Sequence, residues 1–311
     1  MNDQEVYDLI IIGGGPAGLT AGLYATRAKL KTLLLEKLPL PGGQTINAWM
    51  IENYPGFPGG ISGQELMQKM ESQAREFGLV IAAGDVKGVT GNGGMKRVVH
   101  EEGDYWCRSI IVSTGATPNR LGVKGEERLI GKGISFCGTC DGFFFKDKDV
   151  ILVGGGDTAM EEALFLTRFV RHLSVVHRRD TLRAAKVLQE RAFQNPKIEF
   201  LWDTVVEEIG GEKTVEKALL KNLKTGEIVE KNIDGILIFV GTKPSSDFAQ
   251  GAVDLDPRGY ILTDENLETS VPGIFAAGDV RKKLLRQIST AVGDGATAAY
   301  AAEKYLEKLK P

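Results

Sequence analysis

A strand, a glycine-rich loop, a helix and a second strand follow one another twice in this chain, and this repeat is its strongest constraint on the fold. The first copy starts with VYDLIII at 6–12, passes through GGGPAG, and predicts a helix over 17–28 and a strand over 31–35. The second starts with DVILV at 149–153, passes through GGGDTA into a helical stretch, and ends with a strand over 172–176. Apolar strands alternating with helices are typical of buried parallel sheets. The chain is therefore predicted to be α/β, with two βαβ units.

Two stretches rich in glycine, threonine and proline follow buried strands and predict where the chain crosses between domains. The strand expected over 109–113 runs into TGATPNRLG, and the strand expected over 235–240 runs into GTKPSS. Such residues end regular structure and redirect the chain. We therefore predict a discontinuous domain, 1–117 with 246–311, and an inserted domain, 118–245.

The first glycine loop carries the dinucleotide-binding pattern GxGxxG. Gly13, Gly15 and Gly18 follow a strand and open a helix, and Glu36 lies at the end of the next strand. In such a site the glycines admit a pyrophosphate, the helix N-terminus binds it, and the carboxylate accepts from ribose hydroxyls. A tight turn without a ligand is the alternative, which the strand–loop–helix context disfavours.

A third glycine motif, GIFAAGD, lies near the C-terminus. It predicts a short apolar strand ending at Gly278 and Asp279, followed by a helix over 288–306. An aspartate there could reach the ribityl chain of a flavin, although a capping aspartate at an ordinary strand end would look the same. Together with Glu36, the motif favours FAD in the outer domain.

The second glycine loop has a different chemical partner. Its fingerprint is Gly154, Gly156 and Ala159, and basic residues occupy the place where the first copy has its carboxylate. These are His177, Arg178, Arg179 and Arg183. Arginines bind a 2′-phosphate through charge-assisted hydrogen bonds, so the pattern favours NADP over NAD, with a solvated basic patch as the alternative. The expected fold class is α/β with two Rossmann-like dinucleotide-binding domains, the NADPH domain inserted into a discontinuous FAD domain.

Two cysteines two residues apart, Cys137 and Cys140 in FCGTCDG, precede the second βαβ unit by about ten residues. Zinc would need two more ligands. Neither Cys107, expected to be a packing residue, nor the three histidines have ligand spacing, so we predict no metal. A redox dithiol fits better than an inert pair, because CxxC closes a small disulfide that is readily remade. Asp141 follows directly and could exchange protons with the thiols, or simply cap a helix.

Charge and hydropathy narrow the partners. A net charge of −3 gives no reason to expect nucleic acid or an anionic membrane. The N-terminus MNDQEVYD lacks the basic segment of a signal peptide, and no apolar run reaches the ~18 residues of a transmembrane helix. With three cysteines in all, we expect a cytoplasmic protein without a structural disulfide framework.

Taken together, GGGPAG, CxxCDG, GGGDTA, HRRDxxRA and GIFAAGD, in this order, resemble low-molecular-weight thioredoxin reductase over nearly the whole chain. GGQ, ENYPG and RQ match flavin-contacting segments of that family. The resemblance implies a homodimeric flavoenzyme that passes electrons from NADPH through FAD to the CxxC pair and then to thioredoxin. It also implies that Cys140 faces the flavin C4a, that Cys137 attacks the substrate disulfide and that Asp141 is the acid/base.

The predicted cofactor residues fall into two groups. The flavin group is Gly13, Gly15, Pro16, Ala17, Gly18, Glu36, Gly43, Gln44, Asn53, Gly115, Gly278, Asp279, Arg286 and Gln287. The NADPH group is Gly154, Gly156, Asp157, Thr158, Ala159, His177, Arg178, Arg179 and Arg183. Two departures stand out, since the family often has asparagine in place of Asp157 and CATC in place of CGTC, where Gly138 adds backbone freedom.

Alternatives on the same scaffold are a ferredoxin-fed reductase, a dithiol oxidase using oxygen, and a reductase of a glutaredoxin-like partner. The intact HRRDxxRA argues against the first two, because neither needs a 2′-phosphate site. A flavin-binding redox sensor belongs to a different class, and it would reduce little thioredoxin-type disulfide under excess NADPH.

Overall fold

The computed structural model describes residues 5–48, 50–91 and 94–309, which form two compact units. One unit combines the ranges Met1–Thr117 and Lys243–Pro311, and the other is Pro118–Thr242. The chain thus leaves the first unit after residue 117 and returns to it after residue 242. The assignment of FAD to the first unit and NADPH to the second stays a prediction.

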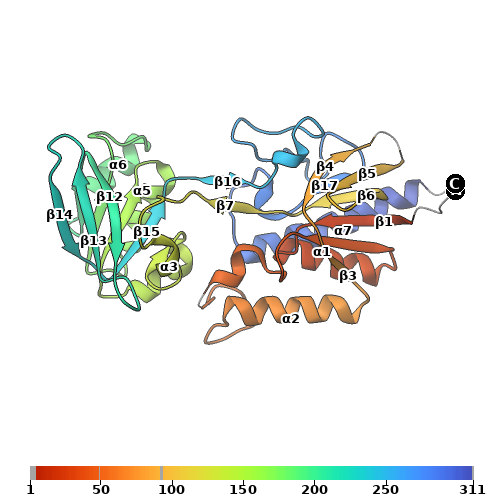
Figure 1. Cartoon of the computed structure of the whole chain (residues 1–311), viewed down its shortest axis with the longest axis horizontal. Coiled ribbons are helices and arrows are strands. Elements are labelled where there is room, and N and C mark those ends of the chain that lie inside the picture. The colour runs from red at the N-terminus through yellow and green to blue at the C-terminus, as the bar shows by residue number, and fades with distance from the viewer. Residues whose placement is uncertain (1–4, 49, 92–93, 310–311) are drawn as a thin grey trace. The chain divides into compact units, whose positions relative to one another are not determined.

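A seven-stranded sheet forms the centre of the first unit (Figure 1). Its strands are β1 (Val6–Ile12), β2 (Thr32–Glu36), β3 (Val80–Ala83), β4 (Val86–Thr90), β5 (Lys96–His100), β6 (Tyr105–Val112) and β17 (Ile274–Ala276). The order is β3-β2-β1-β6-β5-β4, and β17 pairs with β6 in parallel. Only the β4–β5–β6 pairings are antiparallel. The parallel strands β1, β2 and β6 are apolar runs because both faces of the sheet are covered.

Helices complete this unit, and the predicted helices beginning near 17 and at 288 are confirmed. The long ones are α1 (Pro16–Arg27), α2 (Gly63–Glu76) and α7 (Ile288–Lys308), and the short 3-10 helices are η1 (Gly43–Asn47), η3 (Asp247–Ala249) and η4 (Gly278–Val280). Helix α1 contacts both α2 and α7. None of the helices in the described part of the chain is both long and apolar enough to cross a membrane.

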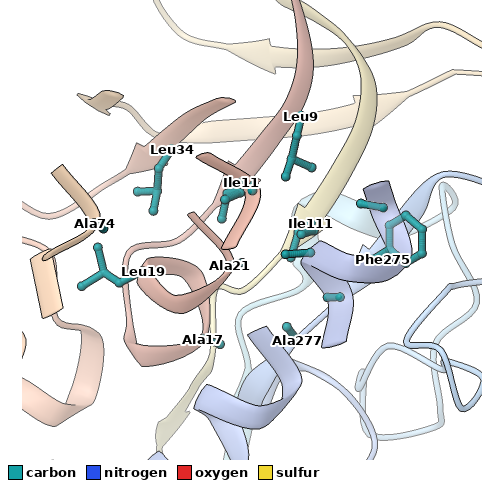
Figure 2. Close-up of a cluster of buried hydrophobic side chains, with 14 of the residues drawn as sticks. Leu9, Ile11, Ala17, Leu19, Ala21, Leu34, Ala74, Ile111, Phe275 and Ala277 are labelled. Atoms are coloured by element: carbon teal, nitrogen blue, oxygen red, sulfur yellow. The ribbon is translucent and has the colours of Figure 1, made fainter. Parts of the chain in front are cut away.

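A cluster of buried apolar side chains joins the sheet to α1 and α7. Figure 2 shows Leu9 and Ile11 of β1, with Phe275 of β17, among the side chains gathered between strands and helices. The helices contribute mostly alanines, which bring their backbones close together. At Gly295 of α7 the approach is closest, because a Cβ there would lie 2.2 Å from the carbonyl oxygen of Ala17 on α1.

The second unit contains a parallel sheet and a smaller antiparallel one. The parallel sheet, in the order β11-β10-β9-β15-β8, consists of β8 (Ile134–Ser135), β9 (Asp149–Gly154), β10 (His172–Val176), β11 (Ile198–Leu201) and β15 (Gly235–Phe239). The antiparallel sheet is β12 (Thr204–Gly210), β13 (Lys217–Asn222) and β14 (Ile228–Asn232). The helices are α3 (Glu126–Leu129), α4 (Gly138–Asp141), α5 (Asp157–Leu166), α6 (Lys186–Phe193) and the 3-10 helix η2 (Gly142–Phe145).

Successive side chains of β9 pack alternately in two separate hydrophobic cores. Val150 and Leu152 pack in the cluster that includes α5, whereas Ile151 and Val153 pack in the cluster that includes β12 and β13. This alternation is the period-two geometry of a strand covered on both sides. The second predicted βαβ unit is confirmed, although α5 ends at Leu166 and hydrogen-bonded turns carry the chain on to β10.

A two-stranded ribbon carries the chain between the units. It consists of β7 (Ala116–Pro118) and β16 (Thr242–Pro244). On the side of the first unit, the Thr114 hydroxyl donates to the Ser245 carbonyl at 2.6 Å, and the Ser245 N–H donates to the Gly115 carbonyl at 2.9 Å. The two predicted crossings therefore lie side by side.

We expect Gly295→Ala to destabilise the first unit by about 1–3 kcal/mol, because its methyl group would overpack the α1–α7 contact. Gly293, on the same helix, has open space around it. The control Gly293→Ala should therefore be neutral or stabilising by up to about 1 kcal/mol. Thermal unfolding followed by circular dichroism measures both, at about 2–4 °C per kcal/mol for a unit of this size. Indistinguishable melting temperatures for the two variants would contradict the prediction.

Candidate functional site

The two cysteines of the CxxC form a disulfide in a single short turn. Cys137 and Cys140 are bonded, with their Cα atoms 5.3 Å apart. Cys137 precedes α4 as its N-cap residue, and the Cys140 N–H donates to Cys137 Sγ at 3.1 Å. A sulfur in this position receives a backbone donor that would also stabilise a thiolate. Cys107 is instead fully buried in β6, where burial raises its pKa to about 12 and makes it the expected packing residue.

A partly buried acid lies beside the disulfide. Asp141 is the last residue of α4, and the Ser135 hydroxyl donates to its Oδ2 at 2.5 Å. Burial raises the pKa of the Asp141 carboxyl, and the bond from Ser135 offsets this only in part. The raised pKa lies closer to neutral pH, where the carboxyl can both donate and accept a proton, as the predicted acid/base role requires.

Ser135 is a site residue that sequence reasoning missed. Its hydroxyl accepts from the Cys137 N–H at 3.1 Å and lies 3.2 Å from the Cys137 carbonyl oxygen. A hydroxyl has one proton, so Ser135 can donate either to this carbonyl or to Asp141. When Asp141 is protonated it can donate to Ser135, which then turns to Cys137. The only sequence signal was a serine two residues before the CxxC.

The glycines of the first loop divide into two kinds. Gly13 has φ +102°, and a Cβ on it would lie 2.6 Å from the Ser113 carbonyl oxygen. A Cβ on Gly18 would lie 1.9 Å from the Gly13 carbonyl oxygen. Gly15, directly before α1, has nothing within 4 Å of the same position. Packing thus requires glycine at positions 13 and 18. At Gly15, by contrast, there is open space at the N-terminus of α1.

Glu36 lies beside this loop at the end of β2. The Gly14 N–H donates to its Oε2 at 2.6 Å, and the Leu38 N–H donates to its Oε1 at 2.8 Å. These bonds fix the carboxylate in place next to the glycine loop. Each carboxylate oxygen has a second lone pair, so both remain able to accept from ribose hydroxyls.

Several predicted flavin residues gather around the start of α1. A Cβ on Gly43 would lie 3.5 Å from the Gly15 Cα, and one on Gly278 would lie 3.0 Å from the Ala17 Cβ. Pro16, another predicted flavin residue, is the first residue of α1. Gln44 belongs to η1, the short helix that Gly43 begins.

A further part of the predicted flavin set lies around the strand end at β17. Arg286 donates to the Asp279 carbonyl at 3.5 Å, and Asn53 donates to the Gln287 side chain at 3.1 Å. The Asp279 Oδ1 is buried without a hydrogen-bond partner in the described part of the chain, and burial raises the pKa of this carboxyl. A buried polar atom of this kind needs a partner, and a ribityl hydroxyl would supply one. The residues present therefore fit FAD.

The second glycine loop repeats this design. A Cβ on Gly154 would lie 2.7 Å from the Ala159 Cβ and 2.7 Å from the Phe239 carbonyl oxygen, whereas Gly156 has nothing within 4 Å. Asp157 and Thr158 are exposed in the first turn of α5. The N-terminus of α5, like that of α1, therefore has open space beside it, and packing does not explain the glycine there.

The basic residues adjoin this loop. The Arg183 N–H donates to the Gly155 carbonyl at 2.7 Å, and the Ala185 N–H donates to Asp157 Oδ1 at 2.7 Å. Arg178, Arg179 and Arg183 are exposed, and in the described residues none of their guanidinium groups forms an ion pair or hydrogen bond. Three free positive charges beside an open helix N-terminus fit a nucleotide with a 2′-phosphate.

His177 takes a different place from its arginine neighbours. It is buried, and a Cβ on Gly155 would lie 2.3 Å from its ring. Its Nε2 lies 3.1 Å from the Thr181 carbonyl oxygen, and burial, reinforced by the arginines, lowers its pKa. A neutral ring packed under the loop supports the loop, so we assign to His177 a supporting role in the predicted NADPH site.

Known proteins share this combination of folds and motifs. The family described as pyridine nucleotide-disulphide oxidoreductase matches residues 7–295. The thioredoxin reductase of Peptoclostridium acidaminophilum is 49% identical over 310 residues, 98% of each chain, and that of Bacillus subtilis is 46% identical over 311 residues, 100% of this chain and 98% of the relative. The crystal structure of thioredoxin reductase from Streptococcus pyogenes has a TM-score of 0.94 and 47% identity, covering 97% of this chain and 99% of that one.

The chain belongs to the pyridine nucleotide-disulphide oxidoreductase family, among its low-molecular-weight thioredoxin reductases. This membership confirms the predicted fold class and enzyme class. It also favours a reductase over a redox sensor, because the relatives that match nearly the whole chain are thioredoxin reductases.

Asp141→Asn should stabilise the second unit at neutral pH. The raised pKa means that the folded chain resists ionisation of this carboxyl, so ionised Asp141 opposes folding above its folded pKa. The gain from asparagine should shrink as the pH falls and vanish below the ordinary Asp pKa of about 3.9.

The matched control has the opposite sign. Arg171 hydrogen-bonds Asp149 and lowers its pKa, so Asp149→Asn should destabilise at neutral pH and lose its effect in acid. Urea unfolding of both variants from about pH 2.5 to pH 8 covers the range in which each carboxyl ionises and checks the pair. A loss of stability for Asp141→Asn at pH 8 would sink the idea that its charge is unfavourable.

Proposed function

We propose that the chain catalyses NADPH-dependent reduction of a thioredoxin-like protein disulfide, with FAD as its resident cofactor. The observation that carries the proposal is the Cys137–Cys140 disulfide with a partly buried, hydrogen-bonded Asp141 beside it. A disulfide kept only for stability needs no neighbouring acid of raised pKa. Bound FAD would accept a hydride from NADPH and supply two electrons to the disulfide.

The two loops would hold the nucleotides by the same means. The N-termini of α1 and α5, where Gly15 and Gly156 leave open space, would offer backbone N–H groups to pyrophosphates. Glu36 would accept from the adenosine ribose of FAD, and Asp279 from its ribityl chain. Arg178, Arg179 and Arg183 would bind the 2′-phosphate of NADPH. NADH lacks this phosphate, so the three arginines would favour NADPH.

The chemistry of the protein begins once the disulfide is reduced. Two electrons and two protons convert the Cys137–Cys140 bond into two thiols. The Cys137 thiolate then attacks a sulfur of the substrate disulfide, forming a mixed disulfide and releasing one substrate thiolate. Cys140 attacks Cys137 in turn, which restores the Cys137–Cys140 bond and releases the second substrate thiolate. Asp141 holds the proton that leaving thiolates need and takes it back as the attacking thiols ionise.

The local bonds favour Cys137 as the attacking thiol. Its Sγ accepts from the Cys140 N–H, a donor that stabilises negative charge on this sulfur. This agrees with the division of labour that the family resemblance implies, with Cys140 on the flavin side. We extend the proposal to a homodimer on the basis of the resemblance. We extend it to the cytoplasm because three cysteines give no structural disulfide framework. Sedimentation velocity tests the dimer.

Anaerobic titration of the yellow protein with NADPH and with NADH is the deciding experiment. We expect NADPH to bleach the flavin at stoichiometric concentrations, with NADH far less effective. Cys140→Ser should still be bleached yet fail to reduce thioredoxin disulfide. Failure of both nucleotides to bleach the flavin, or retained disulfide reduction in Cys140→Ser, would refute the proposal.

Removing one of the arginine charges that would bind the 2′-phosphate should raise the KM for NADPH and leave the KM for NADH nearly unchanged. Arg178→Ala and Arg183→Ala should each raise the KM for NADPH roughly 10- to 100-fold, since a hydrogen bond to a charged group contributes about 1.5–3 kcal/mol. The KM for NADH should stay within about twofold. Arg191→Ala, at another exposed arginine of the same unit, is the control. Steady-state kinetics with both nucleotides decides, and equal loss for NADPH and NADH would show that these arginines do not read the 2′-phosphate.

A further inference from the structure

A second buried carboxyl group, which no sequence motif indicated, lies against the dithiol turn. It belongs to Glu162 of α5, whose Oε1 accepts from the Thr139 hydroxyl at 3.1 Å. Its Oε2 is buried and, within the described residues, has no hydrogen-bond partner. Burial raises the pKa of this carboxyl, and the hydrogen-bonding groups of Thr139 and Gly138 offset this only in part. Such a group opposes folding and needs a reason to be there.

The carboxyl reaches this place because residue 138 is glycine. A Cβ on Gly138 would lie 2.2 Å from Glu162 Oε2 and 3.3 Å from Leu166 Cγ. The backbone of Gly138 is helical and carries no positive φ, so conformational freedom does not explain the glycine. Space for the carboxyl does. An alanine at position 138, as in the CATC that is frequent in the family, would push the Glu162 carboxyl away from the turn.

We propose that Glu162 is a positioning residue that sets the proton and electron affinity of the dithiol, and that Gly138 gives it access. The inference deepens the proposed function, because it concerns the same Cys137–Cys140 pair. Glu162 contacts Thr139 and abuts Gly138, the two residues between the cysteines. Its charge therefore lies against the turn that carries both sulfurs.

The sign follows from the charges around the pair. The carboxyl groups there are Asp141 on α4 itself, and Glu161 and Glu162 on α5, the helix packed against it. All would be negative when ionised, so each opposes a thiolate. Reduction of the disulfide takes two electrons and two protons and creates thiols that must ionise to react. Ionised Glu162 disfavours the thiolate, and with it the reduced form in which a thiolate is populated, whereas protonated Glu162 does not.

Replacing Glu162 with glutamine keeps the shape and removes the charge. We expect Glu162→Gln to shift the equilibrium with a glutathione redox buffer toward the dithiol by threefold to tenfold, about 30 mV per tenfold. The iodoacetamide alkylation rate should rise at a lower pH than in the parent protein. Both differences should fade below the pKa of Glu162, where the parent carboxyl is also neutral. Mass spectrometry of the alkylated, FAD-loaded full chain reads out both without NADPH, so this test can fail while NADPH still bleaches the flavin.

A double-mutant cycle tests the role of Gly138. Gly138→Ala should shift the equilibrium in the same direction as Glu162→Gln, and the double variant should shift by less than the sum. Glu161→Gln, at an exposed neighbouring carboxylate, controls for loss of one negative charge and should shift the equilibrium less than twofold. An equilibrium and pH profile in Glu162→Gln that match the parent protein would overturn the proposal, even if its melting temperature changed. Fully additive shifts in the cycle would overturn the part assigned to Gly138.

Discussion

Close backbone contact at glycine is the constraint on which both units depend. A Cβ on Gly13, Gly18 or Gly154 would strike a neighbouring backbone or side-chain atom within 3 Å and force the strand end away from the helix start. Gly15 and Gly156 have no such neighbours, although they occupy the equivalent place before each helix. Packing therefore accounts for the first group, whereas the second group leaves space that a ligand can occupy. The same loop thus builds the fold and leaves room for its nucleotide.

Three partly buried carboxyl groups, unlike the glycine loops, reduce the stability of the fold at the sites where we propose a function. Asp141, Glu162 and Asp279 all have pKa values raised by burial, so each opposes folding when ionised. Two adjoin the dithiol and the third lies at the predicted flavin site. Asp149, by contrast, pairs with Arg171 and has a lowered pKa, which marks a carboxylate that stabilises the unit. Among these four carboxyl groups, the direction of the pKa shift separates the three at the proposed sites from the one that stabilises its unit.

Sequence alone could locate most of the fold because the information is local. Apolar runs, glycine loops and the strand-to-helix order predicted both βαβ units, and α7 begins at Ile288 as expected. The sequence could not predict contacts between side chains that lie far apart along the chain. Glu162 lies on a different helix from the cysteines, so no spacing rule relates them. His177 follows the second glycine loop at the expected spacing, yet its ring turns inward under Gly155, which spacing cannot reveal.

The dithiol turn combines a local frame with one distant charge. Ser135, Cys137, Cys140 and Asp141 hold one another through bonds within a single short stretch of chain. Changes at these residues alter the geometry of the reacting atoms. Glu162 contacts the same turn from another helix, so its charge can change while that frame stays intact. The inner residues of a CxxC therefore offer a way to adjust the proton and electron affinity of the pair without disturbing either glycine loop.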